Sequence, residues 1–209
     1  MDMIPAFPLS IIAFPGETIK LHIFESRYRQ MFGEIEERNT TFALIPYYEN
    51  RKTTVGTEMK LIRIIEKYDD GKLDIEVEAI APLEVHKLLS KYPNRLYPGA
   101  EVSRLPWNDE MDRLSNPDLI LAIHKLYSIM NISNVNIKDS SAFRTHQLAH
   151  KVGFNLDQEL EFVKISTEED RQTYMLNHLM RLLPIAEEMK TLRKRAEMNG
   201  HIQNLKPPF

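Results

Sequence analysis

Two histidines have the spacing of a metal site. His146 and His150 stand four residues apart, and on an α-helix both side chains would point from one face, as in zinc-dependent metalloproteases. Those enzymes place a glutamate beside the first histidine as general base, whereas here that position is Gln147, which cannot accept a proton from water. A third protein ligand is also required, and no motif supplies it. We therefore predict no metal and no metal-dependent chemistry at this pair.

The sequence also excludes other catalytic patterns. Its 209 residues include no cysteine, which excludes thiolate catalysis and Cys-based zinc sites. The closest of its 7 glycines are Gly56 and Gly71, too far apart for a dinucleotide fingerprint or a phosphate-binding P-loop. No serine stands in a Gly-x-Ser-x-Gly turn. We therefore predict that the chain is not an enzyme and binds no cofactor.

Charge and hydropathy restrict the partners and the compartment. The formal net charge is −3, and the one basic run, residues 193–195, reads as the solvated end of a helix. We therefore expect no nucleic-acid binding. The N-terminus has no basic, apolar signal sequence, and no stretch approaches the roughly 20 apolar residues of a membrane-spanning helix. With no cysteine, the chain is expected in the cytoplasm.

Aromatic side chains in segments predicted as loops are the best binding candidates. Such residues bury a large area at a small cost in conformational entropy. Each could also be a core residue, and that alternative stays open. The candidates for binding a polypeptide are Tyr47, Tyr48, Tyr97 and Trp107.

The first half of the chain reads as strands with one helix. We predict a strand over residues 9–14, ended by a type II turn at Pro15-Gly16, and a half-buried strand over residues 19–23. A helix is predicted over residues 25–38, with an apolar side formed by Phe24, Tyr28, Met31, Phe32 and Ile35.

A long hairpin over residues 59–80 is the clearest β signal. Leu73, Ile75, Val77 and Ala79 alternate with acidic residues, and Asp70-Gly71 favours a type I′ turn at the reversal. Strands are also predicted over residues 42–47, from Leu83 as a new strand after Pro82, and over residues 101–105.

The second half reads as helical. Asn116 and Pro117 predict the start of one helix, and Ser140 or Ser141 the start of another that ends at Gly153. Residues 166–169 predict a capping box for the last and longest helix. That helix is expected to kink or break at Pro184.

The opening residues resemble a known family. Three elements follow one another over residues 4–31: a Phe-Pro-Leu strand, a Phe-Pro-Gly turn and an Ile-Phe-Glu-x-Arg-Tyr run that enters a helix. This order is similar to the start of the N-terminal substrate-binding domain of the Lon protease family. The chain departs from relatives after the hairpin, at residues 79–82. The motif residues are Phe7, Pro8, Leu9, Phe14, Pro15, Gly16, Phe24, Glu25, Arg27 and Tyr28.

The resemblance implies an α+β fold in two lobes. Residues 1–108 would form a small twisted β-sheet or pseudo-barrel, related to PUA-like folds, with one or two helices, and residues 109–209 a helical bundle. The ATPase and peptidase modules of full Lon proteases have no motif here. The resemblance therefore implies a free-standing, non-catalytic recognition or adaptor domain for unfolded or tagged polypeptides or a partner protein, of undetermined oligomeric state.

Two alternatives remain. The PUA-like analogy allows an RNA-contacting module, and a site between the lobes could hold a small molecule or an active centre. For the motif residues we expect structural roles. Phe7, Leu9, Phe14 and Phe24 should be core. A buried Glu25–Arg27 pair should hold the corner between strand and helix, and its loss would cost about 3–5 kcal/mol.

Overall fold

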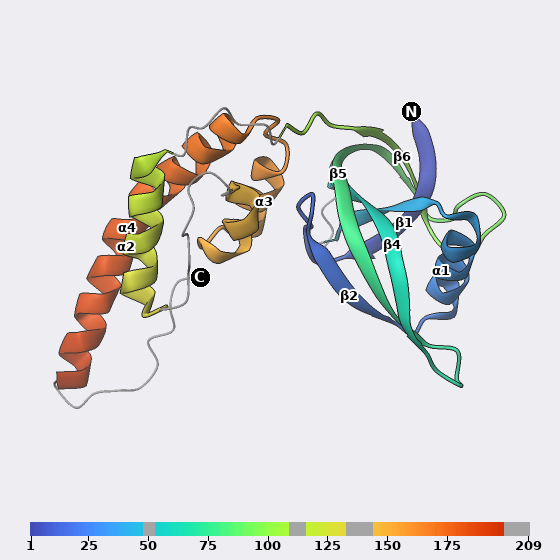
Figure 1. Ribbon diagram of the computed structural model, residues 1–209, viewed down its shortest axis with the longest axis horizontal. Coiled ribbons are helices and arrows are strands. Elements are labelled where there is room, and N and C mark those ends of the chain that lie inside the picture. Colours follow the sequence, from blue (N-terminus) through green and yellow to red (C-terminus); the bar gives the residue numbers. More distant parts are fainter. Residues whose placement is uncertain (48–52, 109–115, 133–143, 199–209) are drawn as a thin grey trace. The chain divides into compact units, whose positions relative to one another are not determined.

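The computed structural model describes residues 1–47, 53–108, 116–132 and 144–198. The chain divides into two compact units, Met1–Trp107 and Asn108–Phe209, which we call the sheet unit and the helical unit. The fold is α+β: a mixed sheet with one helix, followed by helices, as predicted (Figure 1).

The sheet unit contains a six-stranded sheet that closes into a near-ring. Its strands follow the order β2-β5-β4-β3-β1-β6, and β5 also pairs with β6, so that five strands form the ring and β2 extends it outside. Only the β1–β3 pair is parallel among the strand pairs described. The strands are β1 (Asp2–Leu9), β2 (Thr18–Ile23), β3 (Thr41–Pro46), β4 (Val55–Lys67), β5 (Leu73–Leu89) and β6 (Gly99–Arg104).

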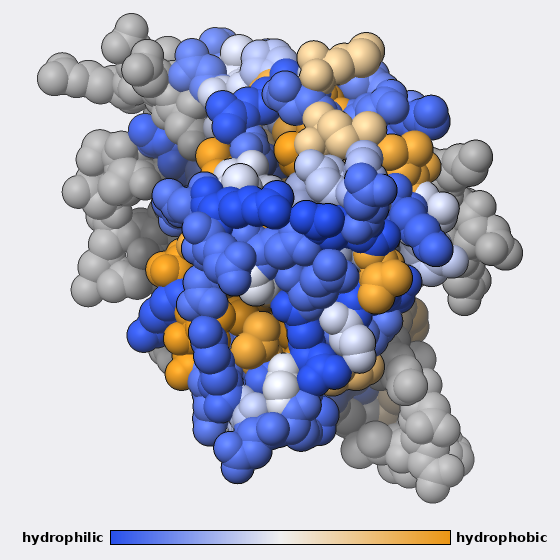
Figure 2. All heavy atoms as spheres, turned by 90° about the vertical axis from the view of Figure 1, so that its right-hand side faces the viewer, coloured by the Kyte–Doolittle hydropathy of each residue, from blue (hydrophilic) through white to orange (hydrophobic). Residues whose placement is uncertain are grey.

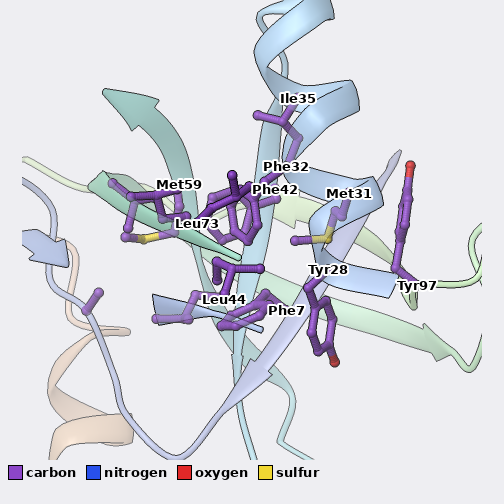
Figure 3. Packing of buried hydrophobic residues seen from close by; sticks show 14 of the residues in the cluster. Phe7, Tyr28, Met31, Phe32, Ile35, Phe42, Leu44, Met59, Leu73 and Tyr97 are labelled. Carbon is purple, nitrogen blue, oxygen red and sulfur yellow. The ribbon is translucent and has the colours of Figure 1, made fainter. Parts of the chain in front are cut away.

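Helix α1 (Ser26–Arg38) covers the larger core of this sheet. Its buried residues are Tyr28, Met31, Phe32 and Ile35, and Figure 3 shows these side chains among those of the strands. The Phe7 ring meets the Tyr28 ring edge-on at a centroid distance of 4.6 Å. Full burial of each such side chain stabilises the fold by about 1.5–3 kcal/mol.

Of the four motif residues expected in the core, three lie in or against it and Phe24 does not. Phe7 and Phe14 are buried, and Leu9 packs against the core, whereas Phe24 is 62% exposed. The alternation of β2 explains the difference: Ile23 points into the core, so the next residue points to the opposite side. The other residues of the predicted apolar side of α1, namely Tyr28, Met31, Phe32 and Ile35, are buried as predicted.

The predicted contact between Glu25 and Arg27 exists, but it is exposed. Arg27 Nε donates to Glu25 Oε2 at 2.9 Å, and the two side chains are 42–45% exposed. The expectation of a buried pair is wrong, because both residues lie at the solvent side of the turn between β2 and α1.

Two strand boundaries differ from the prediction. The first strand is β1, which ends at Leu9, and the apolar residues that follow it are buried without being a strand. Strand β5 continues through Pro82 to Leu89 instead of restarting there. A register irregularity on β5 lies just before Pro82, where the ladder can tolerate a missing N–H.

The two predicted turns have different outcomes. Gly16 has a φ of 87°, and Glu17 N–H bonds to Phe14 O at 2.9 Å, which confirms a type II arrangement. At the hairpin, Gly71 N–H bonds to Tyr68 O at 2.8 Å, and only Gly71 has a positive φ. A type I′ turn needs a positive φ at both central residues, so that prediction is wrong. The glycine instead follows the turn as a left-handed residue.

The helical unit contains α2 (Pro117–Met130), the 3₁₀-helix η1 (Thr145–Lys151), α3 (Leu156–Phe162) and α4 (Glu168–Met198). Asn116 caps α2 as predicted, because its side chain accepts from the N–H groups of Asp118 and Leu119. The predicted helix start at Ser140 or Ser141 lies outside the described residues. The part of this predicted helix that the structure describes is the 3₁₀-helix η1, which ends before Gly153.

Helix α4 differs from the prediction at two points. Its cap is Thr167, whose Oγ1 accepts from Asp170 N–H at 3.2 Å, one residue later than the predicted box. The helix also continues through Pro184, so of the predicted kink or break the break is wrong and the kink stays a prediction. Met180, whose carbonyl would lose its partner at this proline, is 62% exposed, and water can bond to that carbonyl.

Candidate functional site

The histidine pair does not share a helix face. His146 and His150 lie on η1, where three residues make a turn, so side chains four residues apart point in different directions. His150 Nδ1 lies 2.7 Å from Glu159 Oε1, and His146 is buried. Within the described ranges, no group of three or more His, Asp or Glu side chains is placed to hold a metal ion.

The predicted aromatic candidates lie in different places. Tyr47 follows β3 and is 55% exposed, Trp107 follows β6 and is half-buried, and Tyr48 falls outside the described residues. Tyr97 is 2% exposed and donates from its hydroxyl to Glu34 Oε2 at 3.1 Å. Burial and the neighbouring carboxylate raise the pKa of Tyr97 to about 12. Its ring therefore belongs to the core.

A pocket of about 390 Å³ lies in the sheet unit beside Tyr97. It is lined by the start of β1, the end of α1 and the side chains of Glu34, Glu58, Tyr92 and Arg104. The rings of Tyr92 and Tyr97 stack with centroids 5.7 Å apart. The pocket thus combines aromatic walls with charged groups.

Arginines hold both carboxylates of this pocket ionised. Burial raises the pKa of Glu34, but hydrogen bonds from Arg95, Tyr97 and Gln30 outweigh it and leave the pKa below its usual value. Glu58 is 6% exposed, and its hydrogen bond from Arg104 lowers its pKa. Neither carboxylate can serve as a general acid near neutral pH, because that role needs a raised pKa. We interpret the pair as a structural network.

A second group of side chains gathers at the closed end of the β4–β5 hairpin. We call His22, Phe24, Tyr68 and Asp74 the hairpin-end cluster. The His22 ring lies 6.3 Å from the Phe24 ring in a stacked arrangement and 5.9 Å from the Tyr68 ring. Asp74 orders these rings, since its oxygens lie 2.6 Å from His22 Nδ1 and 2.7 Å from Tyr68 Oη.

Asp74 also sets the titration of this cluster. The hydrogen bond that Tyr68 donates to Asp74 raises the pKa of Tyr68 to about 12. Hydrogen bonds from His22 and Tyr68 lower the pKa of Asp74. At neutral pH the cluster therefore presents one ionised carboxylate that fixes two rings, beside the exposed ring of Phe24.

Helix α1 holds the hairpin end in place. Arg29 Nη1 donates to Asp70 O at 2.7 Å, and Lys67 Nζ lies 3.0 Å from Glu36 Oε2. A Cβ at Gly71 would lie 2.5 Å from Arg29 Nη1 and would displace the guanidinium, and the φ of 82° independently favours glycine there. The cluster is thus supported by a packed helix.

Two isoleucines of β4 are exposed by irregularities in the strand pairing. Ile62 and Ile65 are each 44% exposed. The β4–β5 register shifts between Leu61 and Arg63 and again between Ile64 and Glu66, so each isoleucine is an extra residue without an opposite partner. Bulges of this kind redirect a side chain and increase the local twist. They place apolar groups in solvent along the strand that leads to Tyr68.

Charged residues surround these apolar groups. Lys60 pairs with Glu78 at 2.7 Å and Arg63 with Glu76 at 2.6 Å across the two strands of the hairpin. The face of the molecule in Figure 2 is mainly hydrophilic, with apolar side chains in small separate groups.

A protein-family model matches most of this chain. The model described as the substrate-binding domain of ATP-dependent protease La (LON) matches residues 3–195. The chain belongs to this family. The resemblance of its opening residues to Lon substrate-binding domains is therefore confirmed over nearly the whole sequence.

Solved structures of Lon N-terminal domains share the fold. A Lon N-terminal domain protein from Xanthomonas campestris has 22% identity and a TM-score of 0.66, covering 85% of this chain and 98% of that chain. The N-terminal domain of a Lon protease of the Mycobacterium avium complex has 13% identity and a TM-score of 0.56, covering 86% and 98%. Among curated protein sequences, none matches this chain.

The hairpin-end cluster of this Lon substrate-binding domain was missed by sequence reasoning. Phe24 belongs to a family-like motif and was assigned to the core, although the alternation of the preceding strand places it on the other side. The alternation of inward and outward side chains over residues 18–23 was the signal in the sequence that could have identified Phe24 as exposed. The contacts of Tyr68 and Asp74 with His22 depend on how β2 pairs with β5, which the sequence alone does not specify. In the part of the chain that the structure describes, no helix is long and apolar enough to cross a membrane.

Proposed function

We propose that this protein binds unfolded polypeptides without catalysing their chemistry, and that the sheet unit carries the binding surface. The observation that carries the proposal is the match of residues 3–195 to a domain named for substrate binding in an ATP-dependent protease. Substrates of a protease must be recognised as polypeptides, and an unfolded chain differs from a folded one chiefly by its exposed apolar side chains and backbone groups.

The apolar groups around the hairpin end suit such a ligand. Phe24 is 62% exposed beside His22 and Tyr68, and Ile62 and Ile65 are exposed on the same hairpin. An exposed aromatic ring in a fixed position contributes contact area without a large loss of side-chain entropy on binding. The hairpin-end cluster, held by α1 and Asp74, is therefore the proposed centre of contact.

The other classes of function have less support. Pairing between Lys60, Arg63 and the glutamates of β5 leaves no uniformly basic face on this hairpin for a phosphate backbone. The carboxylates of the pocket are ionised and bound by arginines, which does not favour acid–base catalysis there. A polypeptide ligand remains the better proposal.

The proposal is tested with two matched variants of the full chain. Phe24→Ser removes an exposed ring of the cluster, and Leu96→Ser removes a side chain of nearly equal exposure elsewhere in the sheet unit, at 63%. Binding is measured by fluorescence anisotropy with labelled, reduced and carboxymethylated α-lactalbumin. We expect Phe24→Ser to weaken binding about tenfold and Leu96→Ser to leave it within about twofold of wild type. Equal binding by both variants and the wild type would contradict the assignment.

A further inference from the structure

Strand β2 has a free edge in the sheet. It lies at the end of the strand order and, among the strands that the structure describes, pairs only with β5 (Figure 1). Ala79 N–H bonds to Glu17 O, so residues 19, 21 and 23 continue the hydrogen-bonded positions toward β5. The backbone N–H and C=O groups of Thr18, Lys20 and His22 therefore point away from β5. Among the described residues, no other segment forms a backbone hydrogen bond with them.

The two faces of this edge differ in character. Ile19 and Leu21 are partly buried and pack against the main core, whereas Thr18, Lys20 and His22 are exposed. A strand added beside β2 would consequently have one row of side chains facing apolar residues and the other facing solvent.

On the solvent face, one row of side chains alternates in charge from strand to strand. Lys60 and Arg63 of β4 lie next to Glu78 and Glu76 of β5. Beyond β5, Lys20 stands opposite Glu76, and His22 stands opposite Asp74. In the row of Arg63, Glu76 and Lys20 the order is thus basic, acidic, basic. A further strand beside Lys20 and His22 would continue the alternation if it carried acidic residues, since opposite charges across neighbouring strands stabilise the pair.

We propose that a polypeptide binds as an additional strand along the free edge of β2, and that the preferred segment alternates apolar residues with aspartate or glutamate. This inference deepens the proposed function and rests on it. The apolar row of the segment contacts Ile19 and Leu21, and the acidic row faces Lys20 and His22. Backbone hydrogen bonds supply affinity independent of sequence, and the side-chain rows supply the preference.

The same charges oppose pairing of β2 with a second copy of itself. Two β2 edges brought together would place Lys20 and His22 next to the same basic residues, and lysine on an edge strand is a common protection against such association. The edge thus excludes its own copy and accepts an acidic strand.

The experiment uses the full chain and fluorescein-labelled peptides in anisotropy titrations. One nine-residue peptide alternates valine and glutamate, a second replaces the glutamates with lysines, and a third carries N-methyl groups on every other residue of the first. We expect the acidic peptide to bind at least about tenfold more tightly than the basic one. The N-methylated peptide should bind more weakly, because its methylated edge can no longer pair with β2 and only the other edge, in the reversed strand direction, remains available.

Three variants at position 20 separate the effect of backbone hydrogen bonding on peptide binding from the effect of charge. Lys20→Pro removes an outward N–H that β5 does not use, so the β2–β5 hydrogen bonds are kept. We expect it to weaken binding of the acidic peptide about tenfold more than the matched control Lys20→Ala does. Lys20→Glu should reverse the preference toward the basic peptide. Circular dichroism and thermal melts check that each variant is folded, and the N-methylated peptide tests the edge with the wild type alone.

The outcomes distinguish this inference from the proposed function. If unfolded α-lactalbumin binds wild type and Lys20→Pro equally, and N-methylation has no effect on the peptide, strand addition is wrong while polypeptide binding stands. If neither the unfolded protein nor the acidic peptide binds the wild type, both proposals fail. Equal binding of acidic and basic peptides would contradict the charge preference.

Discussion

Arg104, at the end of β6, donates from Nε to Glu58 Oε2 at 2.5 Å and from Nη2 to Glu58 Oε1 at 2.9 Å. The two residues lie on β6 and β4, the strands that flank β5, so the contact ties the ring together across its rim. Thr41 of β3 donates to the same carboxylate at 2.8 Å. Glu58 is thus a buried charge with three donated hydrogen bonds from two strands.

Replacing Arg104 by methionine should destabilise the sheet unit. Glu58 is 6% exposed and would keep only Thr41 as a donor among these partners, and an under-bonded buried carboxylate costs about 2 kcal/mol. Urea unfolding at pH 7 measures the loss. The control is Lys60→Met, which breaks the exposed pair with Glu78 and should cost about 0.5 kcal/mol. Equal losses in the two variants would show that Arg104 contributes as little as a surface ion pair.

Arg27→Ala should have a small effect on stability. The Arg27–Glu25 pair is exposed on both sides, and the guanidinium lies 4.6 Å from the centroid of the Tyr28 ring. An exposed ion pair with a weak cation–π contact contributes about 1 kcal/mol or less. Thermal unfolding of wild type and variant measures it. A loss well above about 2 kcal/mol would mean that the pair is buried in solution, as the sequence had suggested.

The helical unit should lose stability in mild acid through His178. Its Nε2 lies 3.0 Å from Val152 O and so carries the hydrogen, while Nδ1 accepts from Gln158. Burial lowers the pKa of His178, outweighing the hydrogen bond to Val152. Because the folded state then binds the proton less readily than the unfolded state, stability is full above the unfolded pKa of about 6.5 and falls as the pH drops below it.

The matched measurement is urea unfolding at pH 7.5 and pH 5.0 for wild type and His178→Gln. We expect the wild type to lose more stability between these pH values than the variant does. The other titrating groups cancel in this comparison, since they are present in both proteins. The same pH dependence in the two proteins would contradict a buried neutral imidazole.

Tyr68 should titrate at an unusually high pH. Its hydrogen bond to Asp74 raises the pKa to about 12, so the cluster contributes stability below pH 10 that is lost as the pH rises toward 12. The difference in absorbance at 295 nm between wild type and Tyr68→Phe isolates this group. In an Asp74→Asn background the midpoint should fall toward 10. A wild-type midpoint already near 10 would show that the bond is absent in solution.

Local patterns in the sequence predicted the parts of the fold that depend on neighbouring residues. The alternation of Leu73, Ile75 and Val77 identified the buried face of β5, and Asn116 with Pro117 identified the start of α2. These signals arise within one element, where side-chain period and capping act over a few residues.

Features that depend on distant segments were not predictable in this way. Arg29, 42 positions before Gly71, donates to the carbonyl of Asp70 in the hairpin turn, a contact that no local pattern in the sequence indicates. Phe24 is a different case, because the alternation along β2 is a local signal: the residue was assigned to the core from its apolar character, although that alternation indicated the exposed side.

The central claim, that this chain recognises unfolded polypeptides, is tested most directly with the wild-type protein and one ligand in two states. Anisotropy titrations would compare reduced, carboxymethylated α-lactalbumin with the native, disulfide-bonded form. We expect the unfolded form to bind with a Kd well below about 1 mM, more favourable than about −4 kcal/mol, and the native form to bind at least about tenfold more weakly. Equal affinities for the two forms, or no binding of the unfolded form at millimolar concentration, would contradict the account.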